Sequence, residues 1–154
     1  MHCSTHTPSQ YIYTHTDGLL PTWKCPVSSV LIVLQLSACD LRDRTALTEA
    51  EKQKLRQQFV AFGSTVANRL EQLGYQSDLF DPKTGLPMLS TPGRLHLDDV
   101  AVVRDCLGYP TQGHRGCSVI LHPTWGSAVY PSVLLSSAPP ELVAWVANDV
   151  IKGG

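Results

Sequence analysis

The sequence predicts an α+β fold, in which helices pack on a mixed, mostly antiparallel sheet. Residues 29–36, SVLIVLQL, form a continuous run of β-branched residues and leucine, which is typical of a central strand buried on both faces. A long amphipathic stripe follows over residues 48–73. The complete predicted order is strand, strand, long helix, strand, helix, strand, strand, helix, which favours an antiparallel sheet over repeated strand–helix–strand units.

The N-terminal part of the chain predicts a strand and a loop before the central strand. Residues 10–15, QYIYTH, alternate aromatic and β-branched side chains and predict a short edge strand. Residues 27–39, VSSVLIVLQLSAC, also resemble a lipoprotein signal that ends at Cys39. The preceding residues lack a signal's positively charged start, and the apolar run is too short to span a bilayer. A buried strand is therefore the preferred interpretation.

The clearest predicted element is the helix over residues 48–73. Thr48 and Glu51 have the spacing of a capping box, which satisfies free backbone N–H groups at a helix start. Gly74 stands where a glycine commonly ends a helix. The apolar stripe between them consists of Leu55, Phe59, Phe62, Val66, Leu70 and Leu73. We expect this helix to lie across one face of the sheet.

Shorter elements follow in the C-terminal half. Residues 77–80 predict a brief strand, and residues 81–85, DPKTG, have the composition of a turn. Asp98 and Asp99 precede a helix over residues 100–107, where their charges favour the helix start.

The last third of the chain predicts a loop, two strands and a helix. Residues 109–116 have the composition of a polar loop. Residues 119–121 and 128–135 predict strands, which a turn at HPTWG would join as a hairpin, and residues 139–151 predict a helix.

Composition indicates one globular domain over residues 1–154. Hydrophobic residues make up 43% of the chain and charged residues 16%, which is enough apolar material for one core. The net charge is −1 and the basic residues are scattered, which argues against binding to nucleic acid or to an anionic membrane. Because few charges are available to cover the surface, we expect a partner or a second copy of the chain to cover part of it.

The cysteines and histidines indicate a reducing compartment and no metal of the protein's own. The five cysteines are odd in number, widely spaced and without a C-x-x-C pair, so a disulfide framework is not expected. The six histidines have no zinc-type spacing. We therefore expect a cytoplasmic protein.

Cys117 begins the stretch GCSVILHPTWGSAV and permits two interpretations. It is a small buried apolar residue, or it is a reactive thiol whose thiolate form the positive charges of His114 and Arg115 would favour. Residues five apart on a strand face opposite sides, so a direct pair of Cys117 and His122 requires the strand to end first, which Pro123 permits. For His122 itself, a hydrogen bond to the backbone at the strand end is the plainer interpretation.

Three separated segments resemble the methylmalonic aciduria and homocystinuria type D protein (CblD) family. They are GYQSDLFDPKTGL at 74–86, LGY at 107–109 and GCSVILHPTWGSAVYPSVLLSS at 116–137. The family carries Gly-Tyr…Asp-Phe-x-Asp-Pro-x-x-Gly-Leu, then Leu-Gly-Phe, then Gly-Cys-Cys-x-Val-Ile-x-His-x-x-Trp-Gly. Order and spacing match over roughly residues 28–137, whereas residues 1–27 show no match and have an uncertain structure.

This resemblance implies a fold and a function. The fold would be like that of flavin nitroreductases but without the flavin site, with residues 28–151 as the CblD-like core. The chain would be a non-enzymatic cobalamin trafficking adapter that binds a cobalamin-processing protein of the CblC type and serves cobalamin-dependent enzymes. It would hold no cofactor tightly, because the partner presents the cobalamin. The resemblance also implies a core domain without the family's long N-terminal extension.

The resemblance further implies that a cysteine thiolate of the Gly-Cys-Cys segment ligates cobalt, which suits a soft ligand. Counted back from Trp125, Cys117 takes the family's second cysteine and Gly116 the first, which is the presumed ligand. A one-residue deletion before Ser118 would instead give Cys117 the first position. Both alignments remain open, and Cys117 is the candidate ligand in this chain. His122, Trp125 and Gly126 are carried over as motif residues with a preferred structural role.

Two other classes of function remain alternatives. One is a cysteine-dependent redox or transferase enzyme that uses Cys117, with His114 or His122 as general base. The other is a purely structural interaction domain in which the cysteine is inert. Homodimerisation is compatible with every one of these functions.

Overall fold

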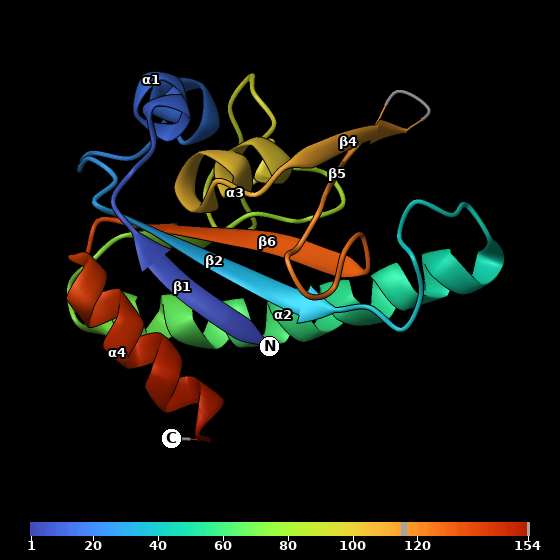
Figure 1. The fold of residues 1–154 in the computed structure, drawn as a ribbon. Helices are drawn as coiled ribbons and strands as arrows, with labels where there is room; N and C mark the ends of the chain where they lie inside the picture. The colour runs from blue at the N-terminus through green and yellow to red at the C-terminus, as the bar shows by residue number, and fades with distance from the viewer. Residues whose placement is uncertain (115–116, 154) are drawn as a thin grey trace.

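A four-stranded antiparallel sheet forms the centre of the computed structural model, which describes residues 1–114 and 117–153 and only the backbone of His114 and Cys117. The strand order is β1–β2–β6–β3, and every neighbouring pair is antiparallel (Figure 1). The strands are β1 (His2–His6), β2 (Ser29–Leu36), β6 (Val129–Ser136) and β3 (Ser77–Leu79). The predicted α+β class is confirmed.

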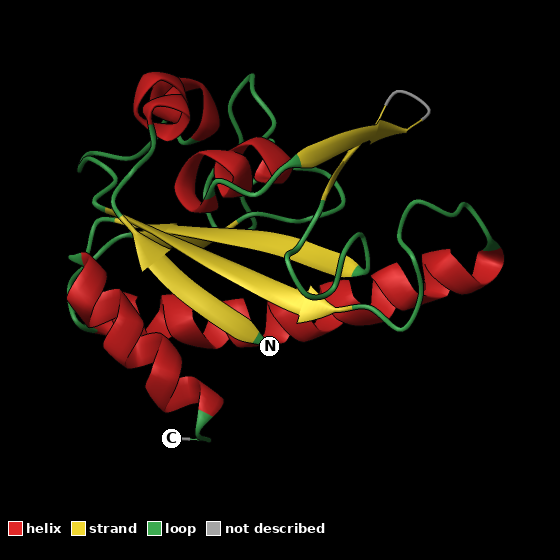
Figure 2. Ribbon diagram, in the orientation of Figure 1, coloured by secondary structure: helices red, strands yellow, loops and turns green. Residues whose placement is uncertain are grey.

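Helices cover both faces of this sheet (Figure 2). Helices α2 (Ala46–Gln72) and α4 (Pro140–Ile151) lie on one face, and α1 (Gln10–Leu19) and α3 (Asp99–Leu107) lie on the other. Strands β4 (Thr111–His114) and β5 (Cys117–Ile120) form a separate two-stranded hairpin on the side of α1 and α3.

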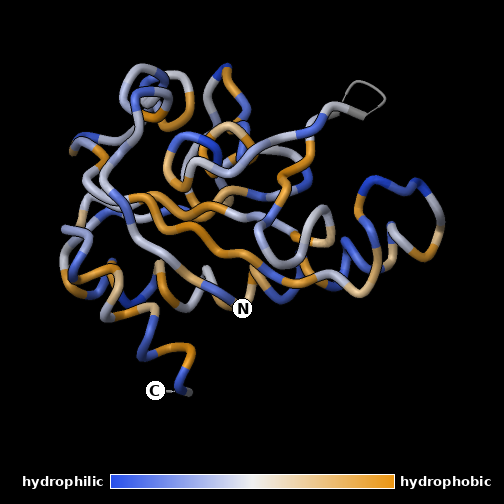
Figure 3. Tube along the Cα trace, in the orientation of Figure 1, coloured by the Kyte–Doolittle hydropathy of each residue, from blue (hydrophilic) through white to orange (hydrophobic). Residues whose placement is uncertain are grey.

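The buried strand predicted at residues 29–36 is confirmed as β2. Alternate side chains of this strand enter two different apolar clusters. Ile32 packs with residues of α1 and α3, whereas Val33 packs with residues of α2 and α4, and both side chains are fully buried. Figure 3 shows the resulting hydrophobic colour along the central strands and the hydrophilic loop between β2 and α2.

The long helix is confirmed, but its predicted capping box is wrong. Thr45 caps α2, because its side chain accepts a hydrogen bond from the N–H of Thr48 at 3.1 Å. Glu51 instead accepts a hydrogen bond from the N–H of Ala38, in the loop after β2. The helix starts one turn earlier than the sequence spacing suggested, so Glu51 is free to fix that loop. At the other end Gly74 terminates the helix as predicted, with a φ of 96°.

The strand predicted at residues 10–15 is wrong, because this segment begins α1. The side chain of Ser9 accepts a hydrogen bond from the N–H of Ile12 and caps the helix. Ile12 and Leu19 are fully buried at a spacing of seven residues, which corresponds to two helical turns, whereas Tyr13 is 78% exposed. β1 is one of the two edge strands of the sheet, so residues 1–27 contribute a strand and a helix.

The predicted hairpin between residues 119–121 and 128–135 is also wrong. β5 pairs with β4, so Thr111 lies opposite Ile120, and the predicted polar loop at 109–116 contains a strand. β6 lies between β2 and β3, where the ladder with β2 runs along its whole length. β5 therefore pairs with β4 in a separate two-stranded sheet and not with β6. The strand at 77–80 and the helices at 100–107 and 139–151 are confirmed within a residue at each end.

Candidate functional site

Cys117 is the first residue of β5, at the outer end of the β4–β5 hairpin. Its backbone pairs with that of His114 across the hairpin. β4 and β5 extend away from the four-stranded sheet on the side of α1 and α3 (Figure 1). The side chain of Cys117 and the whole of Gly116 lie outside the described residues, so the roles predicted for them stay predictions.

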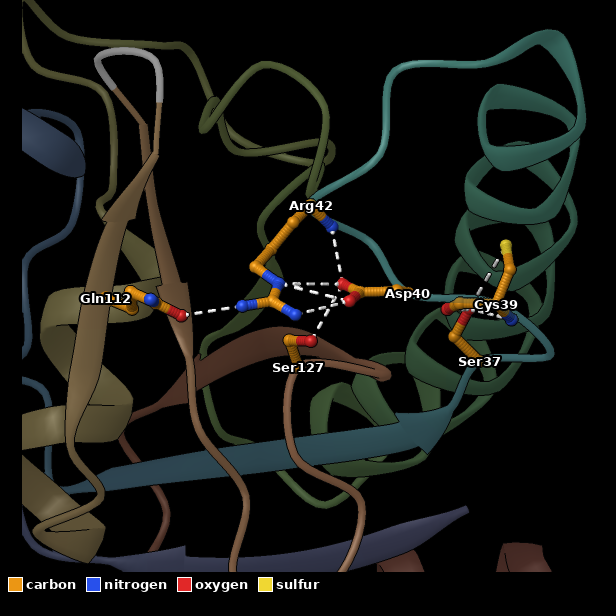
Figure 4. Close-up of polar contacts among 6 residues, drawn as sticks. All are labelled: Ser37, Cys39, Asp40, Arg42, Gln112 and Ser127. Atoms are coloured by element: carbon orange, nitrogen blue, oxygen red, sulfur yellow. Dashed lines mark hydrogen bonds and ion pairs between the residues drawn. The ribbon is translucent and has the colours of Figure 1, made fainter.

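An arginine in the loop after β2 forms a hydrogen bond with the hairpin, and an aspartate of the same loop holds that arginine (Figure 4). Arg42 donates side-chain hydrogen bonds of 2.7 to 3.2 Å to the carboxylate of Asp40. The Nη1 atom of Arg42 also donates to Oε1 of Gln112 in β4 at 2.9 Å. The guanidinium therefore connects the loop to the hairpin, and it holds the pKa of Asp40 well below its usual range.

The same carboxylate holds the segment that leads into β6. The hydroxyl of Ser127 donates to Oδ1 of Asp40 at 2.7 Å. The loop is itself fixed locally, because Ser37 donates to the carbonyl oxygen of Cys39 at 2.7 Å. Three segments far apart in the sequence therefore meet at the Asp40–Arg42 pair, as Figure 4 shows. Sequence reasoning missed this cluster, because no local pattern signals contacts between residues 70 and 87 positions apart.

His122, Trp125 and Gly126 form one tight turn after β5. The Nδ1 atom of His122 accepts hydrogen bonds from the N–H groups of Thr124 and Trp125 at 3.0 and 3.1 Å. The backbones of His122 and Gly126 exchange two hydrogen bonds of 2.8 and 2.9 Å, and Gly126 has a φ of 57° that suits glycine. The imidazole ring stacks on the indole of Trp125 at a centroid distance of 4.4 Å. These contacts brace the turn.

The hydrogen bonds to His122 also determine its protonation chemistry. Since Nδ1 accepts from the backbone, the neutral ring carries its proton on Nε2. Burial lowers the pKa of His122, which favours this neutral form. The ring therefore has no free lone pair with which to accept a proton from Cys117.

The segment 74–86 holds its structure through two aspartates. Asp78 is fully buried and accepts hydrogen bonds from the N–H groups of Met88, Leu89 and Ser90 at 2.7 to 3.1 Å. Asp81 accepts two hydrogen bonds of 2.7 Å from the guanidinium of Arg56 in α2. Both carboxylates therefore form hydrogen bonds with other parts of this chain and have a structural role.

The other cysteines are free thiols in four different environments. Burial raises the pKa of Cys3 to about 11 and also raises that of Cys106. Cys39 is half-buried near the hydroxyls of Ser37 and Thr48, whereas Cys25 is exposed. Among the residues that the structure describes, no three His, Cys, Asp or Glu side chains are grouped to hold a metal ion.

The fold and the site define a small α+β protein in which polar contacts hold a hairpin that carries a cysteine. The sequence profile of the family "Methylmalonic aciduria and homocystinuria type D protein" matches residues 1–147, and the chain belongs to this family. The match includes residues 1–27, where we found no resemblance in the sequence.

Curated relatives agree with this assignment. The chain is 23% identical over 139 residues to the human "Cobalamin trafficking protein CblD". This alignment covers 90% of the chain and 47% of the relative. The proteins of the same name from Rattus norvegicus and Mus musculus are each 22% identical over the same length. The chain thus spans about half the length of the curated relatives it matches. Within the described residues, no helix is both long enough and apolar enough to cross a membrane.

Proposed function

We propose that this chain takes part in cobalamin trafficking as a non-enzymatic adapter, in which the thiolate of Cys117 ligates the cobalt of a cobalamin that a partner holds. One observation carries the proposal. Cys117 begins β5 at the outer end of a hairpin that extends away from the main sheet and is held by Arg42. A hairpin held in this way brings its outer end to a partner with little loss of conformational freedom.

The proposed ligation is a simple coordination step. The thiol of Cys117 loses its proton to solvent, and the sulfur donates an electron pair to the cobalt. Neither group is oxidised or reduced. A thiolate is a soft ligand suited to transition metals, and the basic neighbours His114 and Arg115 in the sequence favour its formation.

The other cysteines are less suited to this role. The raised pKa values of Cys3 and Cys106 keep both as neutral thiols near pH 7, and both pack against apolar clusters. Cys39 lies in the loop that Glu51 fixes and contacts the hydroxyl groups of Ser37 and Thr48. Cys25 is exposed but lies in the loop after α1, so it provides a matched control.

The partner in this proposal is a cobalamin-processing protein of the CblC type. The names of the relatives support cobalamin as the cargo, since each of them is called a cobalamin trafficking protein. We further propose that the chain serves cobalamin-dependent enzymes in the cytoplasm. Its fold in this proposal is like that of flavin nitroreductases but lacks the flavin site.

The geometry of His122 makes the enzymatic alternative less well supported. A cysteine-dependent enzyme needs a base that accepts the thiol proton, and Nδ1 of His122 already accepts two backbone N–H groups. His114, the other candidate base, has a side chain outside the described residues and stays a prediction. Turnover of a small disulfide or electrophile by the isolated protein would favour the enzyme instead.

Absorbance of the cobalamin tests the proposal. The protein is mixed with a CblC-type protein loaded with cob(II)alamin, and the visible spectrum is recorded for the wild type, Cys117→Ser and Cys25→Ser. We expect a new cobalt–thiolate absorbance in the wild type and in Cys25→Ser, and its loss in Cys117→Ser while the complex still elutes as one species. The same absorbance in Cys117→Ser would contradict the proposal. If the wild-type protein forms the complex but the cobalt–thiolate absorbance is missing, a purely structural interaction domain would be favoured.

A further inference from the structure

A cavity of about 680 Å³ lies beside β5, and the proposed cobalamin chemistry does not use it. Its volume is within the range of pockets that hold small molecules. Ser118, Val119 and Ile120 of β5 line one wall, directly after Cys117. The remaining walls come from α2 with the loop before it, the turn after β3, the start of α3 and the first half of β6.

The shortness of β3 explains why this space is open. β3 pairs with Leu134–Ser136 only, so the half of β6 that begins at Val129 has no strand on that side in the described part of the chain. Pro131 lies in this half and has no N–H group with which to pair another strand. Val129, Tyr130 and Pro131 line the cavity there.

Cationic side chains dominate the charged part of the lining. Arg42, Arg44, Lys52, Arg56 and Lys83 contribute to it, whereas Glu49 and Asp99 are its only acids among the described residues. Arg42 and Arg56 are neutralised by Asp40 and Asp81. The Nζ atom of Lys52 lies 3.5 Å from Oε1 of Glu49. The Glu49 side chain is 65% exposed, and such a surface ion pair is weak. Lys83 forms no ion pair with any described residue.

Apolar and polar groups also line this space. Leu41, Ile120 and Val129 are buried and supply apolar surface. Tyr130, which is 8% exposed, also lines this space. Burial and the neighbouring Asp98 raise the pKa of the partly buried Asp99 to about 7, so this carboxyl opposes an anion less than an ordinary aspartate would.

We propose that this cavity binds a small organic anion, whose charged group lies against Lys52 and Lys83 and whose apolar body packs on Ile120, Val129 and Leu41. The anion adds a negative charge beside Lys52 and Lys83, and its body packs on the apolar part of the lining. The site is independent of cobalt ligation, although a ligand in it would contact the strand that Cys117 begins.

Three probes with the same aromatic ring test this site by NMR titration of the ¹⁵N-labelled chain. Phenyl phosphate and benzoate carry an anionic group, and benzyl alcohol is the neutral control. We expect saturable shifts of the Lys83, Val119 and Ile120 amides with an anionic probe and weaker binding of benzyl alcohol. Whichever anion binds more tightly identifies phosphate or carboxylate as the preferred group.

Variants show whether the lysines bind the anion. The double variant Lys52→Met/Lys83→Met is expected to lose about tenfold in affinity, whereas Lys54→Met, on the same helix but outside the lining, is expected to bind like the wild type. Cys117→Ser is expected to bind normally, so failure of the cobalt proposal would leave this site intact. Absence of saturable shifts, equal binding of benzyl alcohol, or unchanged affinity in the folded double variant would overturn the proposal.

Discussion

The guanidinium of Arg56 and the carboxylate of Asp81 form two hydrogen bonds of 2.7 Å each, which join the long helix α2 to the turn after β3. Both side chains are mostly buried, with 23% and 12% of their surface exposed. Asp81 also accepts from the N–H of Lys83 at 2.9 Å. This pair therefore fixes the turn of the family segment 74–86 against the helix.

Loss of the Arg56–Asp81 pair is expected to destabilise the fold. Arg56→Met should lower the free energy of unfolding by about 1 to 2 kcal/mol near neutral pH, because it leaves a mostly buried carboxylate without its partner. Urea unfolding measures this change. Arg104→Met is the control, since Arg104 is 55% exposed and contacts Asp105 at 3.5 Å, and an equal loss in both variants would contradict the prediction.

The same pair has a predictable dependence on pH. Arg56 lowers the pKa of Asp81, so this carboxylate contributes stability that is present above its unfolded pKa and is lost as the pH falls through its folded pKa. The difference in stability between the wild type and Asp81→Asn should therefore shrink on acidification below about pH 4. A constant difference between neutral and acidic pH would show that the pair does not titrate in this way.

Gly85 should tolerate alanine much less than Gly74 does. Both have positive φ angles, 74° and 96°, but a Cβ atom on Gly85 would lie 2.8 Å from the carbonyl oxygen of Leu97, whereas one on Gly74 has no atom within 4 Å. We expect losses in unfolding free energy of about 2 to 3 kcal/mol for Gly85→Ala and about 1 kcal/mol for Gly74→Ala. Thermal or urea unfolding of the two variants compares them, and similar losses would count against the steric argument.

Asp99 should lower stability as the pH rises. Its folded pKa of about 7 lies above that of an unfolded aspartate, so between these values the unfolded chain releases a proton that the folded chain retains. This group should therefore lower the free energy of unfolding progressively from about pH 4 to pH 7. Relative to the wild type, Asp99→Asn should therefore become more stable across this interval, because asparagine does not titrate. Parallel pH profiles for the wild type and Asp99→Asn would contradict this prediction.

Arg42 is expected to control the mobility of the hairpin rather than the stability of the sheet. Arg42→Ala removes the bond to Gln112 in β4, so amide hydrogen exchange in Thr111–Gly113 should accelerate by about threefold or more while β2 stays protected. Asp43→Ala, in the same loop, is the control. Unchanged exchange in β4, or equal acceleration in β2, would show that Arg42 does not hold the hairpin.

Segments with a strong apolar pattern were predictable from the sequence. Val30 to Leu34 are buried from both sides, and such a run has few alternatives to a central strand. Gly74 ends α2 because its backbone adopts a conformation that glycine favours. In both cases the local residues carry the structural information.

Other elements depend on contacts that no local pattern reveals. The alternation in QYIYTH suggested a strand, but packing of Ile12 and Leu19 in the core favours a helix. β4 has a polar sequence, TQGH, and forms only because β5 pairs with it. At the candidate site, the turn at His122 lies within a local motif, whereas the contact of Asp40 with Ser127 joins residues 87 positions apart.

Cobalt K-edge X-ray absorption of the assembled complex tests the central claim most directly, because it detects the atom bound to the metal. The complex contains this chain and a CblC-type protein loaded with cob(II)alamin, and it is measured for the wild type, Cys25→Ser and Cys117→Ser. Thiolate ligation predicts a sulfur neighbour of cobalt in the wild type and in Cys25→Ser, and its absence in Cys117→Ser. A cobalt with only nitrogen and oxygen neighbours in the wild-type complex would contradict it.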